Sequence, residues 1–165
     1  MGFSERFRGF RVPVCAPAGS QGDDQSLGGG TLRLVDTSLV TRKLGDYFRE
    51  RSDLAAVYLF GSVARGTAGT ASDIDVGALY RATPGSTLEA QPFADEAALS
   101  QLLGRSVQLI AMNTAPVDLV HRILRDGILI IEPDRSRRIA FEVRSRNEYF
   151  DLLPILREYR QRASP

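Results

Sequence analysis

The sequence contains very little lysine, cysteine or histidine, and no tryptophan, and two of these shortages exclude a class of site. Lys and Arg together number 21 among the 165 residues, and only Lys43 is a lysine. A phosphate-binding loop built on a lysine is excluded, so cationic contacts to phosphate must come from arginine or backbone N–H groups. Cys15 is the only cysteine, which excludes an internal disulfide and a cysteine zinc site. This usage is typical of a reducing compartment, and we expect a cytoplasmic protein.

The sequence also lacks a strong charge of one sign and any long apolar run. Its 21 basic residues are balanced by 20 acidic ones. The broad positive field of proteins that bind duplex nucleic acid is therefore absent, and we expect no DNA partner. No apolar segment approaches the roughly 20 residues that span a bilayer. Since Arg6 also stands where an N-myristoylation signal has Ser or Thr, we expect no membrane association.

The first 34 residues differ in composition from the rest of the chain. Residues 16–30, APAGSQGDDQSLGGG, are rich in Gly, Ser and Asp and show no apolar periodicity. Such a segment cannot bury enough apolar surface to offset the entropy of ordering it. The remaining length suffices for one domain with a core. We therefore predict a mobile N-terminal extension over residues 1–34 and a single domain over residues 35–165.

Apolar periodicity from Asp36 onward predicts alternating helices and strands. Helices are expected at 37–51, 88–103 with Pro92 beginning or interrupting it, 116–126, and 134 to about 162 with Pro154 ending or kinking it. Strands are expected at 54–60, 74–80, 107–112 and 128–131. This alternation indicates an α/β fold.

Residues 60–77, FGSVARGTAGTASDIDVG, place two aspartates shortly after a Gly-Ser turn. Asp73 and Asp75 alternate with apolar residues and should therefore share one face of a strand. Because neighbouring carboxylates repel each other, we interpret the pair as a site for a divalent metal. Gly61 lets the backbone approach a ligand closely, Ser62 offers a hydroxyl, and the N–H groups of the turn suit a phosphate. A nucleoside triphosphate with Mg²⁺ is expected between the turn and the aspartates.

Two further residues of the same motif are assigned to the bound nucleotide. Arg65 follows the Gly-Ser turn, and Ser72 immediately precedes the aspartates. For Arg65 we favour a role in supporting the aspartate loop over a catalytic one.

The stretch AAVYLFGSVARGTAGTASDIDVGALY resembles the nucleotidyltransferase motif of the polymerase-beta superfamily: Gly-Ser, ten residues, then Asp-x-Asp. It is most similar to the minimal nucleotidyltransferases, small prokaryotic proteins often paired as antitoxins with a HEPN-domain toxin. The stretches VQLIAMNTAPVDLVHRILRDGILIIEPD and RRIAFEVRSRNEYFDLLPILREYR extend the resemblance over about residues 36–162. It implies a small mixed β-sheet flanked by helices, ATP as substrate with Mg²⁺, and transfer of AMP to a hydroxyl. In antitoxin members the acceptor is a tyrosine of the HEPN ribonuclease, which the AMP silences.

The sequence departs from the family pattern where a third carboxylate is expected. Active members carry this carboxylate on a later strand beside the aspartates, and the matching residue here is Gln108. A glutamine can offer an oxygen to a metal but cannot accept a proton, and positioned acid–base assistance is worth about 10²–10⁴-fold in rate. With Asp73 and Asp75 as catalytic and metal-binding residues and Gln108 as a further metal ligand, we expect nucleotide binding with slow or absent transfer.

Two other functions stay open. One is an antitoxin that has lost catalysis and neutralises its partner by covering it, which Gln108 would permit. The other is a small-molecule nucleotidyltransferase of the aminoglycoside-modifying type, although this chain is short for the second domain that an acceptor pocket normally needs. The nucleobase, the acceptor and the oligomeric state, including a homo-oligomer, are not fixed by the sequence.

The single histidine and the C-terminal arginines complete the candidates. His121 lies in the middle of a predicted helix, where we expect a surface or packing role. We interpret the arginines of the last helix as a solvated face paired with Glu142, Glu148 and Glu158. These arginines are Arg135, Arg137, Arg138, Arg144, Arg146, Arg157, Arg160 and Arg162. Because Tyr149 and Tyr159 lie among them, a docking face for a HEPN partner or a second copy is the alternative.

Overall fold

The computed structural model describes residues 36–69, 71–85 and 92–163, the last eight by their backbone alone. The predicted extension over residues 1–34 lies outside the described residues. The helices are α1 (Thr37–Phe48), α2 (Gly61–Ala64), α3 (Phe93–Leu103), α4 (Val117–Asp126) and α5 (Arg135–Ala163). The strands are β1 (Leu54–Phe60), β2 (Ile74–Tyr80), β3 (Val107–Ala111) and β4 (Ile128–Ile131). The four predicted strands and the four long predicted helices are thereby confirmed to within a few residues at their ends, except that residues 88–91 of the predicted helix 88–103 lie outside the described residues.

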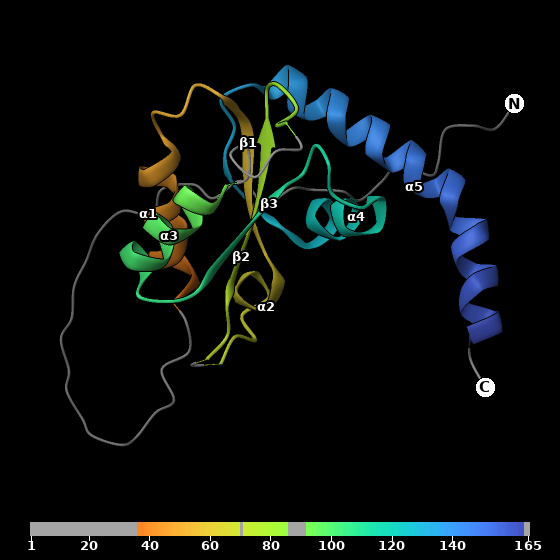
Figure 1. Cartoon of the computed structure of the whole chain (residues 1–165), viewed down its shortest axis with the longest axis horizontal. Coiled ribbons are helices and arrows are strands. Elements are labelled where there is room, and N and C mark those ends of the chain that lie inside the picture. The colour runs from red at the N-terminus through yellow and green to blue at the C-terminus, as the bar shows by residue number, and fades with distance from the viewer. Residues whose placement is uncertain (1–35, 70, 86–91, 164–165) are drawn as a thin grey trace, which may run out of the picture.

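The strands form one mixed sheet in the order β3-β2-β1-β4. β1 pairs antiparallel with both β2 and β4, whereas β2 and β3 run parallel. The parallel pair needs a crossover, which α3 supplies. In Figure 1 the sheet is seen nearly edge-on, with α1 and α3 on one face and α4 and α5 on the other. The predicted small mixed sheet flanked by helices is confirmed.

Alternate residues of the central strands fill two separate hydrophobic cores. Ile74, Val76 and Ala78 of β2 pack with α1 and α3 on one face. Leu79 packs with α4 and α5 on the other. β1 is buried along nearly its whole length, on both faces of the sheet. Its sequence is therefore a continuous apolar run and does not alternate between apolar and polar residues. The period of two therefore assigns Asp75 to the face of the sheet that α4 and α5 cover.

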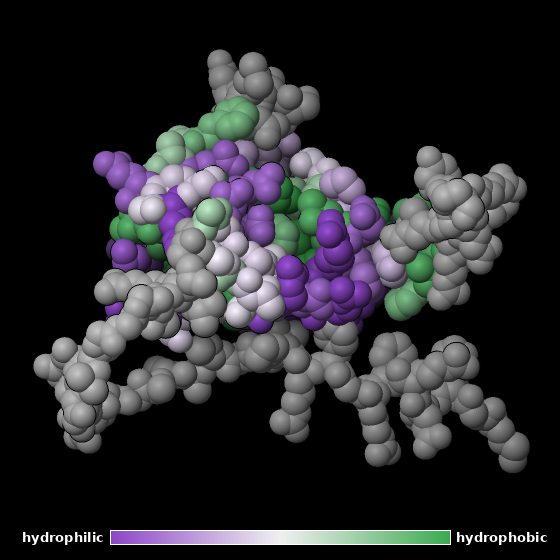
Figure 2. Space-filling model, turned by 90° about the horizontal axis from the view of Figure 1, so that it is seen from below, coloured by the Kyte–Doolittle hydropathy of each residue, from purple (hydrophilic) through white to green (hydrophobic). Residues whose placement is uncertain are grey.

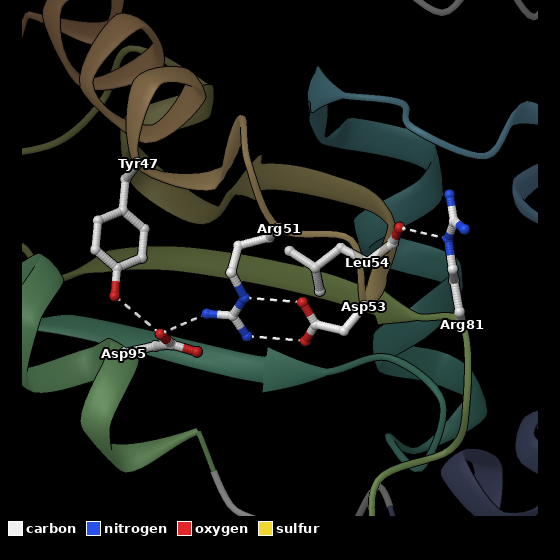
Figure 3. A network of polar contacts seen from close by, with 6 residues as sticks. All are labelled: Tyr47, Arg51, Asp53, Leu54, Arg81 and Asp95. Atoms are coloured by element: carbon white, nitrogen blue, oxygen red, sulfur yellow. Dashed lines mark hydrogen bonds and ion pairs between the residues drawn. The ribbon is translucent and has the colours of Figure 1, made fainter.

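A polar network ties α1 and α3 to the sheet at the end where β1 begins (Figure 3). Asp95 of α3 accepts hydrogen bonds from the Tyr47 hydroxyl (2.8 Å) and from Arg51 Nη1 (2.7 Å). Arg51 also donates two hydrogen bonds to the Asp53 carboxylate, at 2.8 and 2.9 Å. Arg81, which follows β2, donates from Nε to the Leu54 carbonyl at 3.2 Å. Charge-assisted bonds of this kind fix the start of β1. The candidate site lies at the other end of the strand.

The long helix α5 is anchored through polar side chains. Glu142 accepts hydrogen bonds from the Tyr58 hydroxyl of β1 (2.9 Å) and from Arg138, which also donates from Nε to Glu132 at 2.6 Å. Arg138 and Glu142 are only 8% and 9% exposed. The prediction that these two residues belong to a solvated face is therefore wrong, because the buried Tyr58 hydroxyl requires a polar partner.

The apolar side of α5 faces solvent instead. Ile139, Val143 and Phe150, which the sequence places on one side of the helix, are 43%, 52% and 60% exposed. α5 continues through Pro154 to Ala163, so the alternative that Pro154 ends the helix is wrong. Figure 1 shows the last part of α5 turned away from the direction of its first part, as a proline kink requires.

Candidate active site

The Asp75 carboxylate lies directly against Gly61. Phe60, the last residue of β1, pairs with Asp75 of β2, so the turn that follows β1 and the aspartate meet at one edge of the sheet. Gly61 has a φ of +74°, and a Cβ added to it would lie 1.9 Å from Asp75 Oδ2. Only glycine fits there, since a side chain would meet both the backbone strain and the carboxylate. The predicted juxtaposition of the Gly-Ser turn and Asp75 is present in the structure.

The two aspartates concentrate negative charge at this edge. Asp73 is exposed immediately before β2, and Asp75 is half-buried on the strand. Burial raises the pKa of the Asp75 carboxyl above its ordinary value, the neighbouring Asp73 raises it further, and Arg65 opposes both effects. Neither carboxylate accepts a hydrogen bond from the described residues. Such partly buried charge disfavours the fold unless a cation approaches it.

Gln108 occupies the position beside Asp75 at which the third carboxylate is expected. β2 and β3 are parallel, and Asp75 pairs with Gln108. Val107 and Leu109 are buried on the side of α1 and α3, so Gln108 projects from the other face and is exposed. Paired residues of adjacent strands point to the same face, and the Gln108 side chain therefore emerges next to that of Asp75.

The loop between the Gly-Ser turn and the aspartates is held by hydrogen bonds of its own. The Ser72 hydroxyl oxygen accepts from the Gly69 N–H at 2.9 Å, which leaves the hydroxyl proton available for a ligand. Arg105, just before β3, donates from Nη1 to the carbonyls of Gly69 (3.2 Å) and Ser72 (3.3 Å). The Ser62 hydroxyl makes no hydrogen bond with the described residues. Ser62 therefore remains a candidate contact to a phosphate.

Arg65 lies between two carboxylates. Its positive charge lowers the pKa of Asp75 and that of Asp126 at the end of α4. The pKa of Asp126 is lowered mainly by Arg125, which donates from Nε and Nη2 to its two oxygens at 2.8 and 2.7 Å. The Arg65 backbone N–H donates to the Gly61 carbonyl at 3.3 Å, whereas its exposed side chain forms no hydrogen bond with the described residues, so the guanidinium can turn toward a phosphate.

Sequence reasoning missed Arg105 and Asp126. Both reach the site only through strand pairing: Ser106, next to Arg105, accepts from the Ile74 N–H at 2.9 Å, and Ile128, close to Asp126, pairs with Leu59 of β1. No local motif marks either residue. A correct pairing of β2 with β3 and of β1 with β4 could have found them.

The residues present fit a magnesium ion that also binds the substrate. Among the described residues no group of three or more His, Cys, Asp or Glu could hold a metal. Mg²⁺ nevertheless binds commonly through one or two carboxylates together with substrate phosphates. Asp73 and Asp75 supply that pair, and because Gly61 has no side chain, the Asp75 carboxylate can lie directly against the Gly-Ser turn at which a phosphate is expected. Figure 2 shows this end of the molecule, with hydrophilic residues gathered beside a hydrophobic area.

His121 packs rather than faces the carboxylates. Its ring stacks on Tyr149 of α5 with centroids 3.7 Å apart and an interplanar angle of 2°. Burial lowers the pKa of His121, and Arg125 and Arg146 lower it further. His121 therefore joins α4 to α5 as a neutral ring near pH 7, in agreement with the predicted packing role.

The fold and the carboxylate pair define a class of protein. Residues 42–136 match the sequence profile of the family described as polymerase beta, nucleotidyltransferase. This match covers more than half of the chain, so the chain belongs to the polymerase-beta nucleotidyltransferase family. A search of curated proteins finds no match.

Solved structures with the same fold come from toxin–antitoxin systems. A chain of a toxin–antitoxin crystal structure with AMP-PNP superposes with a TM-score of 0.66 at 22% identity, covering 76% of this chain and 98% of that one. A chain of the MntA–HepT complex superposes with a TM-score of 0.61 at 20% identity, and the match covers 78% of this chain and 99% of that one. A third structure is the complex of a tri-AMPylated Shewanella oneidensis HEPN toxin with an MNT antitoxin. One of its chains superposes with a TM-score of 0.63 at 20% identity, and the match covers 79% of this chain and 100% of that one. At these identities the likeness establishes the fold alone.

The described part of the chain contains no helix that is both long and apolar enough to cross a bilayer.

Proposed function

We propose that this protein binds ATP with Mg²⁺ and transfers AMP to a protein hydroxyl, as the antitoxin of a HEPN ribonuclease. The observation that carries the proposal is the Asp75 carboxylate against Gly61, with Asp73 beside it and Gln108 on the neighbouring strand. The family to which the chain belongs supports nucleotidyl transfer.

Each residue of the site has a role in this proposal. Asp73 and Asp75, with the Gln108 side-chain oxygen, would hold Mg²⁺, which neutralises phosphate charge and stabilises the charge that develops during transfer. The Ser62 hydroxyl and the first N–H groups after Gly61 would bind the triphosphate.

Two further residues act on the same nucleotide. Arg65, free to leave Asp75, would contact a phosphate oxygen. Ser72 closes the loop and would donate its hydroxyl proton to the nucleotide.

The chemical step requires a proton acceptor that Gln108 cannot be. The acceptor hydroxyl attacks the α-phosphorus, the bond to the bridging oxygen breaks, and pyrophosphate leaves. The hydroxyl proton must go to a base, and the Gln108 amide accepts none at neutral pH. Because positioned acid–base assistance is worth about 10²–10⁴-fold, we expect transfer that is slower than in members with a carboxylate there.

The register of Gln108 with Asp75 also favours a second candidate function. An antitoxin that binds nucleotide without transferring it would neutralise its partner by covering it. The exposed apolar side of α5, with Ile139, Val143 and Phe150, is the docking surface we propose for the HEPN partner. In support, three structural neighbours come from toxin–antitoxin complexes, one with an AMPylated HEPN toxin. We assign the reaction to the cytoplasm, where ATP is abundant.

The test is a transfer assay with a HEPN-domain protein as the candidate partner. Purified partner, ATP and Mg²⁺ are incubated with the protein, and the mass of the partner is measured. We expect a gain of one AMP or more with the wild type, none with Asp73→Asn/Asp75→Asn, and at least about tenfold faster transfer with Gln108→Asp.

Three results would decide against parts of this proposal. An inhibited but unmodified partner would establish the binding candidate. Transfer by the double variant would contradict the assignment of the aspartates. No gain from Gln108→Asp would contradict the role given to position 108.

A further inference from the structure

A cavity lies at the opposite end of the sheet from the aspartates. It has a volume of about 300 Å³. It is lined by Leu79 of β2, Thr83 after β2, Asn113 after β3, and Arg137, Ala140, Phe141 and Arg144 of α5. Leu79 follows Asp75 by four residues of extended strand, which places it about 13 Å away. The cavity is therefore separate from the candidate active site.

Positive charge dominates the cavity. Arg137 and Arg144 are separated by seven residues on α5, so both guanidiniums emerge on one side of the helix about 10 Å apart along its axis. None of the described residues that line the cavity carries a carboxylate. A ligand that enters the cavity therefore meets two cations whose charges are uncompensated inside it.

Both arginines are available to a ligand. Arg137 uses its backbone N–H to bind Asp134 Oδ1 at 3.0 Å, while its guanidinium forms no ion pair with the described residues. Arg144 Nε lies 3.6 Å from Glu148 Oε1, but both side chains are at least half exposed. An exposed pair of this kind contributes about 0–1 kcal/mol, so Arg144 can exchange it for a stronger anion at little cost.

The rest of the lining is apolar or rigid. Phe141 and Leu79 are buried at 8% and 1% exposure and supply the apolar part of the wall. Asn113 is fixed, because its Oδ1 accepts from the Tyr80 N–H at 2.9 Å and its Nδ2 donates to the Tyr80 carbonyl at 3.0 Å. An amide so held keeps its second Nδ2 proton for a ligand.

We infer that this cavity is a binding site for a small phosphate monoester that carries an aromatic or apolar group, such as a mononucleotide. Its phosphate binds Arg137 and Arg144, and its uncharged part packs on Leu79 and Phe141. Arginine suits this role because its planar fork matches phosphate oxygens. A volume of about 300 Å³ is at the lower limit for small-molecule sites and admits one mononucleotide rather than a polymer.

The site is tested in a protein whose candidate active site is disabled. AMP is titrated without Mg²⁺ into the full chain carrying Asp73→Asn/Asp75→Asn, and binding is followed by calorimetry and by backbone amide NMR. We expect a saturable interaction that shifts the amides of Thr83 and Asn113 and leaves those of Gly61 and Ser62 unchanged. Adenosine should bind at least tenfold more weakly than AMP, and inorganic phosphate should also bind more weakly.

Variants of the lining provide the decisive comparison. Arg137→Gln/Arg144→Gln should weaken AMP binding at least tenfold, whereas Arg135→Gln, which removes one positive charge from the same helix outside the cavity, should not. Ala140→Phe, which fills the cavity from its edge, should also weaken binding. Absence of AMP binding, shifts confined to Gly61 and Ser62, or equal losses in Arg135→Gln and the double variant would overturn the inference. None of these results bears on transfer by Asp73 and Asp75.

Discussion

Gly61 occupies a position where only a residue without a side chain leaves room for Asp75. A Cβ there would lie 1.9 Å from Asp75 Oδ2, and the φ of +74° is unfavourable for other residues. Gly104 provides a matched control, because it has a φ of +66° and nothing within 4 Å of an added Cβ. Gly104→Ala should cost about 1–2 kcal/mol of unfolding free energy, from the left-handed backbone alone. Gly61→Ala should cost about 1–3 kcal/mol more, because the methyl group also displaces the carboxylate.

The two glycine variants are compared by urea unfolding. Equal losses of stability in Gly61→Ala and Gly104→Ala would mean that Asp75 does not lie against the turn.

The ionised Asp75 carboxylate lowers the free energy of unfolding. Because its pKa is raised in the folded protein by burial and by Asp73, the folded state holds its proton more tightly than the unfolded state. Stability is therefore lost as pH rises through the ordinary value of 3.8 toward the raised pKa, and the loss persists at neutral pH. Asp75→Asn should raise the unfolding free energy at pH 7, with little difference from wild type below about pH 3.8.

Asp126→Asn is the contrasting variant. The unfolding free energies of both variants and of the wild type are measured by urea unfolding over a series of pH values. The Arg125 hydrogen bonds lower the pKa of Asp126, so its ionised form stabilises the fold above the ordinary value of 3.8. That stabilisation disappears as pH falls through the lowered pKa. Asp126→Asn should therefore lower stability at pH 7. A loss of stability in Asp75→Asn at pH 7 would contradict the environment described for that carboxyl.

At the residue scale, the sequence alone predicts the part of the candidate site that is local. Asp73, Asp75, Gly61 and Ser62 lie within 15 residues, and their spacing carries a chemical meaning. Gln108 could be predicted because the strand expected beside the aspartates contains only a few residues. The loop contacts of Arg105 required the parallel register of β2 and β3, which periodicity does not encode.

Among the elements, α5 depends on a buried polar contact with β1. Removing the Glu142 carboxylate leaves the Tyr58 hydroxyl and the Arg138 guanidinium without their shared partner in a buried position. Glu142→Ala should therefore lower the unfolding free energy by about 3 kcal/mol, as expected when one member of a buried ion pair is removed.

Glu148→Ala on the same helix is the control for this effect. Among the described residues Glu148 pairs with Arg144 on an exposed surface, so its loss should cost less than about 0.5 kcal/mol. The two variants are compared by denaturant titration followed by circular dichroism. Similar effects of Glu142→Ala and Glu148→Ala would show that the Tyr58 contact does not anchor α5.

The elements themselves were largely predictable, whereas the orientation of α5 was not. Local sequence signals predict these elements: Gly and Asp bound the strands, and Pro92 and Pro116 begin two of the helices. For α5, periodicity shows that Ile139, Val143 and Phe150 share a side but not which way that side faces. The need of the buried Tyr58 hydroxyl for a partner turned Arg138 and Glu142 inward, and this depends on a contact with β1 across 84 residues.

For the whole molecule, the exposed side of α5 predicts where a partner binds. Val143 is 52% exposed in the middle of this side. Val143→Glu should weaken binding to the proposed HEPN partner about tenfold or more, because a charge would be buried in an apolar contact. Gln101→Glu on α3, across the sheet, adds the same charge and should leave the affinity unchanged. Surface plasmon resonance measures both, and an unaffected Val143→Glu protein would assign partner binding to another surface.

The central claim is that Asp73 and Asp75 hold a magnesium-bound triphosphate opposite the Gly61-Ser62 turn. Its most direct test is an amide NMR titration with AMP-PNP, with and without Mg²⁺, in the wild type and in Asp73→Asn/Asp75→Asn. We predict that the Gly61 and Ser62 signals shift only in the wild type with Mg²⁺ present. Unmoved signals, or equal shifts in the double variant, would contradict the account.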